Sequence, residues 1–354
     1  MSEDREGSHA PWLDFRPSDI IQYIYNFVGK LRGCDVATLD DGDVYVIGEG
    51  KYNGVDTAVW VTRATQKLLY FSYRCGFTPL SNGSTTDVAW GCVVRAAQML
   101  LAQAHMRFFN SGHAFVDGSA LQILREKVQP LFLDDPSAPF GIHAMTSEAE
   151  KYGVACGQWF GMTPAAKTIA SLCQQHSLRG GNGPAVLVFV DREVSALKVR
   201  DLLSHSRQVV LLIPAVLGLD RISVKYSKML IRCLEMESCI GVIGGRKSSA
   251  LYFVGHQSNN IIYLDPHRAQ RAFTEVASPG ELTGAWHLLP VTACSTSILF
   301  GFYIDSLESF KQFEADMLEA NSALAFPLIS VATSERLEPD DSGSIGSCSS
   351  GSLA

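Results

Sequence analysis

The chain has 354 residues, of which 47% are hydrophobic and 18% are charged, and its formal net charge at pH 7 is −7. This length and composition provide enough apolar side chains for a globular protein with one sizeable core. The acidic balance, without a basic stripe interleaved with aromatic residues, argues against binding to the phosphate backbone of nucleic acids, so no nucleic-acid partner is expected.

The first third of the chain is predicted to contain one amphipathic helix, two strands and then a long buried helix. The amphipathic helix is expected at Ser18–Leu31, the strands near Asp43–Gly48 and Thr57–Thr62, and the long helix from Cys92 onward. The apolar residues of the long helix recur every three or four positions, as one buried helical face requires. They are Val93, Val94, Ala97, Leu100, Leu101, Ala104 and Phe108.

The middle and the end of the chain form an α+β pattern, in which a mostly helical region is followed by strands. Residues 103–203 are predicted as a helical subdomain, in which Thr163 is the N-cap and Pro164 the first residue of a helix that ends near Gln175. The strands and the last helix are expected at Ala185–Val190, Val209–Ile213, Ala250–Gly255, Ile261–Leu264, Ile298–Ile304 and, for the helix, Ser306–Glu319.

One folded domain at residues 15–329 is predicted between a flexible N-terminus at 1–14 and a disordered tail at 330–354. From Ser334 to Ala354 the chain is too rich in Ser, Gly, Asp and Glu to bury a core. The N-terminus lacks the apolar core of a secretory signal, and the longest apolar stretch, near Val209–Leu219, is too short to span a membrane. Nine scattered cysteines, an odd number, fit a reducing compartment better than a disulfide framework, so the protein is expected in the cytosol.

Cys92 is the leading candidate for a nucleophile because it lies at the start of the predicted long helix. Unpaired amide groups and the positive end of the helix dipole favour an anion there, which lowers the pKa of a thiol. The same amides can stabilise an oxyanion. The alternative is that Cys92 is one more small buried residue among nine cysteines.

Asp265 and His267 are the candidates for the groups that activate the thiol. They follow an apolar strand that is stopped by Pro266, and their spacing of two places both side chains on one side of extended backbone. A carboxylate and an imidazole in that arrangement can act as orienting group and base. The alternative is a turn in which Asp265 binds its own backbone.

No metal site and no cofactor are predicted. The sequence has no Cys-x-x-Cys or His-Glu-x-x-His motif, and its histidines are dispersed, so a zinc site would need ligands from distant segments. The segment 241–248 superficially resembles a phosphate loop but lacks its spacing. It is predicted to be a mobile loop before the strand at Ala250–Gly255, with Gly244 and Gly245 as its flexible points.

Taken together, the segments that contain Cys92 and His267 resemble the autophagins, a family of papain-like cysteine proteases that process and release the ubiquitin-like modifier of autophagy. The two segments read Thr-Asp-Val-Ala-Trp-Gly-Cys and Tyr-Leu-Asp-Pro-His. Further segments resemble the family in the same order, from about Leu69 to Phe313. They are Phe71-Ser72-Tyr73-Arg74, Gly157-Gln158-Trp159-Phe160-Gly161, Leu211-Leu212-Ile213-Pro214, Gly241-Val242-Ile243-Gly244-Gly245 and Gly301-Phe302-Tyr303.

The resemblance implies a papain-like α+β fold, with the nucleophile at a helix N-terminus and the Asp/His pair on a mainly antiparallel sheet. It implies that Cys92 is the nucleophile, His267 the general base and Asp265 the carboxylate that orients it. Tyr73 matches a tyrosine that helps to form the oxyanion site, and Trp159 a tryptophan that covers the groove.

Gln158, Gly244 and Gly245 are expected beside the substrate, the two glycines in a loop that moves when substrate binds. Read without the resemblance, Tyr73 would be a core aromatic of a strand and Trp159 a core anchor.

The chain departs from the family pattern at three places. Ala89 stands before Trp90 where glycine is usual, the loop after Tyr73 is shorter and carries residues Ser81–Ser84 instead of a glycine run, and His256 replaces an aromatic residue. None of these changes removes a member of the expected triad. An active enzyme with an altered substrate preference is therefore expected.

The implied activity is cleavage after the C-terminal glycine of a ubiquitin-like autophagy modifier and release of that modifier from phosphatidylethanolamine. The implied partners are the precursor and the lipid-conjugated modifier, with transient membrane contact through the conjugate, and the enzyme is expected to act as a monomer. The alternatives are a papain-like deubiquitinase and a non-catalytic protein that binds the modifier.

Two smaller features have open interpretations. Phe326–Ile329 has the form of a short peptide that adds to the sheet edge of a modifier, whereas the alternative is ordinary packing of Phe326. Cys75, two residues after Tyr73, is a place where oxidation would matter if its thiol were exposed.

Overall fold

The computed structural model describes residue 26 and residues 38–40, 42–113, 117–246, 248–278 and 282–333. The predicted flexible N-terminus at 1–14, the helix expected at Ser18–Leu31 apart from Asn26, and residues 334–354 of the predicted tail lie outside this part of the chain.

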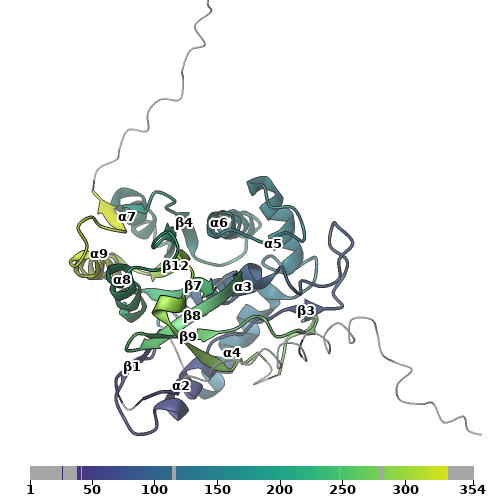
Figure 1. Cartoon of the computed structure of the whole chain (residues 1–354). Coiled ribbons are helices and arrows are strands. Elements are labelled where there is room, and N and C mark those ends of the chain that lie inside the picture. The colour runs from purple at the N-terminus through teal and green to yellow at the C-terminus, as the bar shows by residue number, and fades with distance from the viewer. Residues whose placement is uncertain are drawn as a thin grey trace, which may run out of the picture.

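A nine-stranded sheet occupies the centre of the molecule (Figure 1). Seven strands follow the order β11-β9-β8-β7-β12-β6-β4, the short strand β1 also pairs with β8, and β2 pairs with β1. All pairs are antiparallel except β4 with β6. The strands are β1 Val44–Val46, β2 Gly50–Tyr52, β4 Ala185–Val188, β6 Val209–Val216, β7 Cys239–Arg246, β8 Ser249–Gln257, β9 Asn260–Leu264, β11 Trp286–Pro290 and β12 Ser297–Ile304.

Two small parallel pairs lie outside this sheet. β3, Arg74–Cys75, pairs with β10, Gln270–Arg271, and β5, Glu193–Ser195, pairs with β13, Ser330–Ala332. The first pair joins the segment before Cys92 to the segment after His267. The second pair shows that the predicted disordered tail begins too early, because residues 330–332 gain backbone hydrogen bonds to β5 and the preceding Leu328 and Ile329 are buried.

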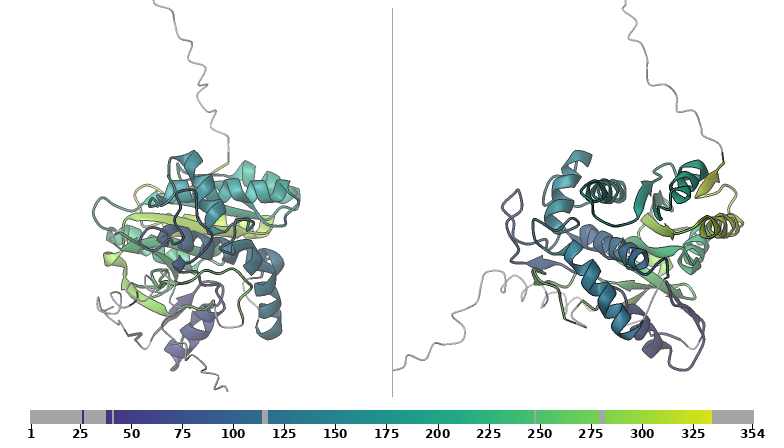
Figure 2. Two further views of the ribbon diagram at one scale, coloured as in Figure 1. Left: turned by 90° about the vertical axis from the view of Figure 1, so that its right-hand side faces the viewer. Right: turned by 180° about the vertical axis from the view of Figure 1, so that it is seen from behind.

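Helices cover both faces of the large sheet (Figure 2). α3 and α6 pack on one face, and α7, α8 and α9 pack on the other. The helices are α2 Thr57–Gln66, α3 Cys92–Phe109, α4 Gly118–Val128, α5 Ile142–Ala149, α6 Met162–Leu178, α7 Ala196–Ser204, α8 Val224–Glu235 and α9 Leu307–Asn321, with short 3₁₀ turns η1 Gln129–Phe132, η2 Glu150–Tyr152 and η3 Val291–Ala293.

The long strands are apolar along their whole length because helices cover them on both faces. In β6, for example, the first seven of eight residues are buried, so the polar and apolar alternation of a half-exposed strand is absent. α3 is likewise buried from Cys92 to Arg107, as expected for a helix that runs through a core. Its first residue is therefore held by a rigid element.

The predicted α+β class with a mainly antiparallel sheet is confirmed, and so is the helix that begins at Cys92. The strand predicted at Thr57–Thr62 is wrong, since these residues begin α2. The buried residues of α2, Thr57, Val61, Ala64 and Thr65, are spaced four, three and one apart, so burial of one helical face outweighs the strand preference of the β-branched residues.

The start of α6 also differs from the prediction. Gly161 is the N-cap and Pro164 is the third helical residue, where its missing N–H still costs no intrahelical hydrogen bond. The helix continues to Leu178.

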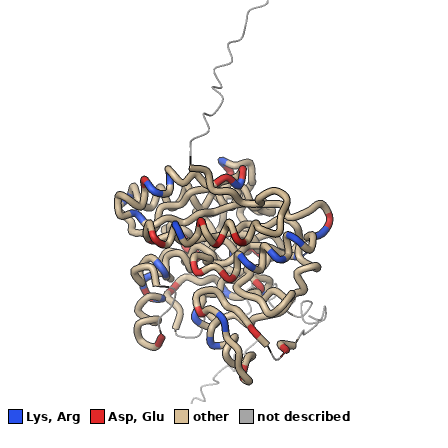
Figure 3. Tube along the Cα trace, turned by 90° about the vertical axis from the view of Figure 1, so that its left-hand side faces the viewer, with Lys and Arg blue, Asp and Glu red and all other residues tan. Residues whose placement is uncertain are grey.

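Charged residues of both signs are interspersed along the chain in the view of Figure 3. No helix of the described residues is long and apolar enough to cross a membrane.

Candidate active site

Cys92 is the first residue of α3, directly after the N-cap Gly91. Its thiol is buried, with 1% of the residue exposed. The first amides of a helix have no intrahelical acceptor, so this position offers N–H donors to an anion, as the sequence predicts. Gly91 is required here because a Cβ would lie 2.6 Å from the carboxylate side chain of Asp87.

Asp265 and His267 lie directly after β9 and form the expected pair. The Nδ1 of His267 donates to Oδ1 of Asp265 at 2.5 Å. The same carboxylate oxygen also accepts the backbone N–H of His267 at 3.0 Å. The two alternatives considered for this segment are therefore both present: Asp265 orients the imidazole and closes a turn of its own backbone.

The electrostatics of these groups favour an ion pair between the thiolate and the imidazolium. Burial opposes ionisation of Cys92, but the hydrogen bond and charge of His267, a backbone hydrogen bond from Ala250 and the indole of Trp159 outweigh it, so the pKa of Cys92 is lowered. Burial also opposes the charge on His267, but Asp265 and Cys92 raise its pKa to about 9. The pKa of Asp265 is lowered, because its bond to His267 outweighs burial.

Trp159 covers the thiol. Its indole Nε1 donates to Sγ of Cys92 at 3.1 Å, while half of the residue is exposed to solvent. The alternative of a core anchor is therefore wrong. Gln158 makes no hydrogen bond to Cys92 among the described residues. Its Oε1 instead accepts the backbone N–H of Ala155 at 3.3 Å and closes a turn in the loop that carries Trp159.

Tyr73 packs against the histidine of the pair. Its ring meets the ring of His267 edge to face, with centroids 5.3 Å apart, and the residue is 1% exposed. Its backbone N–H donates to the carbonyl of Pro266, and its carbonyl accepts the N–H of Gln270, both at 2.9 Å. Tyr73 is thus both a buried aromatic and a neighbour of the candidate base.

Tyr70 contacts the same segment and was not singled out from the sequence. Its hydroxyl donates to the backbone carbonyl of Asp265 at 2.6 Å. Burial raises the pKa of Tyr70 to about 12, so the hydroxyl stays protonated and can keep donating. The sequence offered no local signal for this contact, because 195 positions separate the two residues.

A buried ion network, also missed by the sequence analysis, joins the segments around the nucleophile. Arg95, on the first turn of α3, donates to Asp87 at 2.6 Å and to Asp134 at 2.7 Å, and all three side chains are at most 1% exposed. Asp87 also accepts the backbone N–H of Arg74 at 2.6 Å, and Asp134 that of Phe273 at 2.8 Å. The network therefore fixes the start of α3 relative to β3 and to the chain that follows β10.

Gly244 and Gly245 are not in a mobile loop, as predicted, but in β7, where they pair with Leu251 and Ala250 of β8. A Cβ on Gly244 would lie 2.2 Å from the ring of Phe253, and one on Gly245 would lie 2.2 Å from the carbonyl of Ser249. The glycines therefore allow close packing of the hairpin. They lie near the site because Ala250, the strand partner of Gly245, contributes a backbone hydrogen bond to Cys92.

Three further expectations concern side chains near the site. The thiol of Cys75 is buried and lies 3.3 Å from Oγ1 of Thr86, so the exposure that oxidation would need is absent. His256 turns toward α8, where its Nε2 lies 3.1 Å from a carboxylate oxygen of Glu235. No group of three or more His, Cys, Asp and Glu side chains that could hold a metal ion occurs in the described part of the chain.

Comparisons with known proteins agree with this geometry. Residues 60–316 match the family model of the Peptidase C54 catalytic domain. The chain is 33% identical over 253 residues to the probable cysteine protease atg4 of Schizosaccharomyces pombe, which covers 70% of this chain and 74% of the relative.

Two plant relatives are similar at comparable levels. Cysteine protease ATG4a of Arabidopsis thaliana is 30% identical over 275 residues, 69% of this chain and 58% of the relative. Cysteine protease ATG4b of the same plant is 29% identical over 336 residues, 83% of this chain and 69% of the relative. The chain therefore spans between 58% and 74% of the length of these three proteins.

Proposed function

Because the chain belongs to the peptidase C54 family and is a cysteine protease, we propose that it cleaves after the C-terminal glycine of a ubiquitin-like autophagy modifier. We further propose that it releases the same modifier from phosphatidylethanolamine. Cys92, His267 and Asp265 carry both reactions. The observation that supports this most strongly is the arrangement of the three side chains: the thiol of Cys92 lies at the start of α3 within hydrogen-bond reach of His267, whose ring is held by Asp265 at 2.5 Å. This arrangement also lowers the pKa of the thiol.

In the first step, the thiolate of Cys92 attacks the carbonyl carbon of the glycine and forms a C–S bond. The negative charge that develops on the carbonyl oxygen is stabilised by the backbone N–H of Cys92 and by the side chain of Tyr73. His267 gives its proton to the leaving nitrogen as the C–N bond breaks. The products are a thioester on Cys92 and a free amine.

In the second step, His267 removes a proton from water, and the hydroxide formed attacks the thioester carbonyl. The C–S bond breaks, the modifier leaves as a glycine carboxylic acid that gives its proton to the solvent, and the thiolate and the imidazolium are restored. Asp265 keeps the imidazole in one orientation through both steps. In the lipid conjugate the leaving nitrogen is that of ethanolamine, so the same bonds form and break.

The position of Trp159 supports a preference for glycine. Its indole lies within hydrogen-bond distance of the thiol, so a substrate must displace the ring or pass beneath it. A residue without a side chain needs the least room at the scissile carbonyl. Bulkier residues would be rejected sterically.

The test incubates the wild type and Cys92→Ala with an autophagy modifier that carries extra residues after its glycine, and follows cleavage by mass spectrometry. Cys156→Ala is the matched control, because Cys156 is a partly exposed thiol in the loop that carries Trp159. We expect wild type and Cys156→Ala to release the extension after the glycine and Cys92→Ala to release none.

Extended ubiquitin is tested in parallel. Cleavage of ubiquitin alone would replace the proposal with a deubiquitinase, and binding of the modifier without cleavage by any variant would replace it with a binding protein. Lipid release is tested separately, with the modifier conjugated to phosphatidylethanolamine in vesicles. Failure there alongside precursor cleavage would limit the enzyme to trimming.

A further inference from the structure

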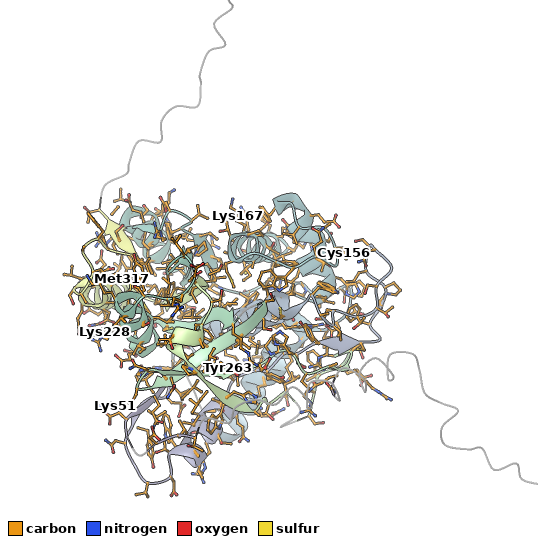
Figure 4. The ribbon with its side chains drawn as sticks, in the orientation of Figure 1. Lys51, Cys156, Lys167, Lys228, Tyr263 and Met317 are labelled. Carbon is orange, nitrogen blue, oxygen red and sulfur yellow. The ribbon has the colours of Figure 1, made fainter. Side chains whose placement is uncertain are left out.

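The segment 76–91, which leads into Cys92, is fastened to the region that carries Trp159. We propose that Asn82 is a positioning residue that keeps the Trp159 loop, residues 154–161, closed over the thiol. In the figures this segment projects beside α5 at the edge of the molecule, close to the labelled Cys156 (Figure 4). The contact is between an exposed asparagine and a backbone carbonyl of the Trp159 loop.

The side chain of Asn82 is held in one orientation by both of its ends. Its Nδ2 donates to the carbonyl of Cys156 at 3.1 Å, and its Oδ1 accepts the backbone N–H of Ser84 at 2.9 Å. Two backbone bonds, from Gly83 to Leu80 at 2.8 Å and from Leu80 to Ser84 at 2.9 Å, close the turn around it. The amide donor is therefore presented by a tight turn and not by a freely rotating side chain.

The Trp159 loop is shaped to receive this donor. Gly157 has a φ of +87°, and a Cβ there would lie 2.7 Å from Nδ2 of Asn82, so only glycine allows the two segments to approach this closely. The bond from the N–H of Gln158 to the carbonyl of Ala155, at 3.0 Å, keeps the loop compact. The hydrogen bond from Asn82 thus fixes the backbone of Cys156, three residues before Trp159, and so restrains the position of the indole.

Two other contacts join the same regions but lie farther along the chain from the indole. Nε2 of His143 bonds to the carbonyl of Thr78 at 2.7 Å, and Oγ of Ser81 lies 3.4 Å from a carboxylate oxygen of Glu150. These contacts anchor the segment to α5 and η2. Asn82 is the contact that reaches the Trp159 loop itself.

The consequence concerns how often Cys92 is accessible. A reagent or substrate reaches the thiol, which is 1% exposed, only in the fraction of molecules in which Trp159 has moved. Loss of one hydrogen bond of the closed state changes an opening equilibrium by about two- to tenfold. Since the bond of Asn82 is exposed to water, we expect about a threefold increase in opening when it is removed.

Only the role of loop opening in admitting substrate rests on the proposed function, so the test of this inference uses no substrate. The full chain is treated with iodoacetamide, and mass spectrometry follows the rate of alkylation at Cys92. Asn82→Asp keeps the acceptor for Ser84 but removes the donor to Cys156, and Asn82→Ala removes both. Asn110→Asp is the matched control, because Asn110 makes the same type of exposed bond, to the carbonyl of His113 at 2.9 Å.

We expect alkylation of Cys92 about three times faster in both Asn82 variants and unchanged in Asn110→Asp. The added negative charge of Asn82→Asp disfavours the thiolate, so it would slow the reaction and cannot explain an increase. In a Trp159→Ala background the Asn82 substitutions should have no further effect. A general loosening of the protein would persist in that background.

Unchanged alkylation in the Asn82 variants, or an equal increase with and without Trp159, would overturn the proposal. The melting temperature of each variant is measured together with the alkylation rate. Combining an Asn82 substitution with Trp159→Ala separates restraint of the Trp159 loop by Asn82 from a general loss of stability. If the wild type fails to cleave the modifier while the alkylation result holds, the proposed function is wrong, but the role of Asn82 in keeping the Trp159 loop closed is still supported.

Discussion

Asp265→Asn is expected to move the alkaline limit of activity toward neutral pH. Burial lowers the pKa of His267, but Asp265, the strongest of the groups that raise it, helps to bring it from an ordinary 6.5 to about 9. The amide of asparagine keeps the size of the side chain but removes its charge. The imidazolium then loses its strongest stabilising partner while the burial that disfavours it remains.

The magnitude follows from the two pKa values. With a pKa of about 9, about 91% of His267 is protonated at pH 8, whereas at 6.5 about 3% is protonated. The ion pair with Cys92 therefore becomes about thirtyfold rarer at pH 8 from protonation alone. Loss of the 2.5 Å bond that orients the ring lowers the rate further at every pH.

The assay is kcat/KM for cleavage of the extended modifier between pH 6 and pH 10. Asp201→Asn is the matched control, because Asp201 also faces a histidine, His205 at 3.7 Å, with both side chains exposed. The alkaline limb should lie near pH 9 in the wild type and in this control. An alkaline limb that stays near pH 9 in Asp265→Asn would refute the assignment of the carboxylate as the group that holds the proton on His267.

The same pKa values predict the pH dependence of stability. A histidine whose folded pKa is raised stabilises the fold fully below its unfolded pKa of about 6.5, and this contribution is lost as pH rises through about 9. The lowered pKa of Cys92 contributes with the opposite sign in this range, because the unfolded thiol holds a proton that the folded thiolate has lost. The free energy of unfolding should therefore fall between these limits in Cys92→Ala, where that contribution is absent, and the fall should shrink in Cys92→Ala with Asp265→Asn. Urea unfolding at several pH values tests this, and an equal slope in both proteins would contradict it.

Three further predictions concern residues that support the site. Tyr70→Phe removes the hydroxyl bond to the carbonyl of Asp265, so kcat should fall several-fold and the free energy of unfolding by about 1 kcal/mol; unchanged kcat would leave Tyr70 only a packing role. Ala89→Gly should stabilise the protein by about 1 kcal/mol in urea unfolding, because Ala89 has a φ of +77°, where glycine is not strained; a loss of stability would contradict this. Arg95→Met leaves two buried carboxylates without their cation and should lower the free energy of unfolding by about 3–5 kcal/mol; a change below about 1 kcal/mol would show that the network is not held as an ion pair.

The parts of the site that the sequence predicts are those in which chemistry and local structure coincide. Cys92 begins a helix whose apolar residues follow one period, and Asp265 and His267 flank a proline after an apolar strand. Both are short-range patterns, and both give the observed positions. What the residues do to one another is visible only in space, because 173 to 175 positions separate Cys92 from the pair.

The predictions that failed did so where tertiary packing outweighs local preference. Gly244 and Gly245 suggest a flexible loop by composition, but the side chain of Phe253 and the backbone of Ser249 occupy the room that side chains would need. Thr57–Thr62 favours a strand by residue type and is a helix because one helical face is buried. In each case the missing information is the identity of the neighbour.

The buried network around Arg95 has the same character. Arg95 and Asp134 are 39 positions apart, and nothing in either local sequence predicts that they meet. Phe326 is a further case: its packing in the core, the alternative considered for it, is wrong because the side chain is 83% exposed, while Ile329 three residues later is fully buried. A peptide that used both side chains to bind a modifier would therefore have to unpack Ile329 first.

Trp159 can close the site without controlling the reactivity of Cys92, because its effect on the pKa of the thiol is small. His267 lowers the pKa of Cys92 more than any other group, whereas the hydrogen bond from the indole of Trp159 has the smallest effect. When the indole leaves, the thiolate keeps its hydrogen bond with His267 and the donors at the start of α3. Opening of the loop therefore exposes a nucleophile whose pKa is still lowered by His267. Access and activation are set by different residues: Asn82 and Trp159 govern the first, and Asp265 and His267 the second.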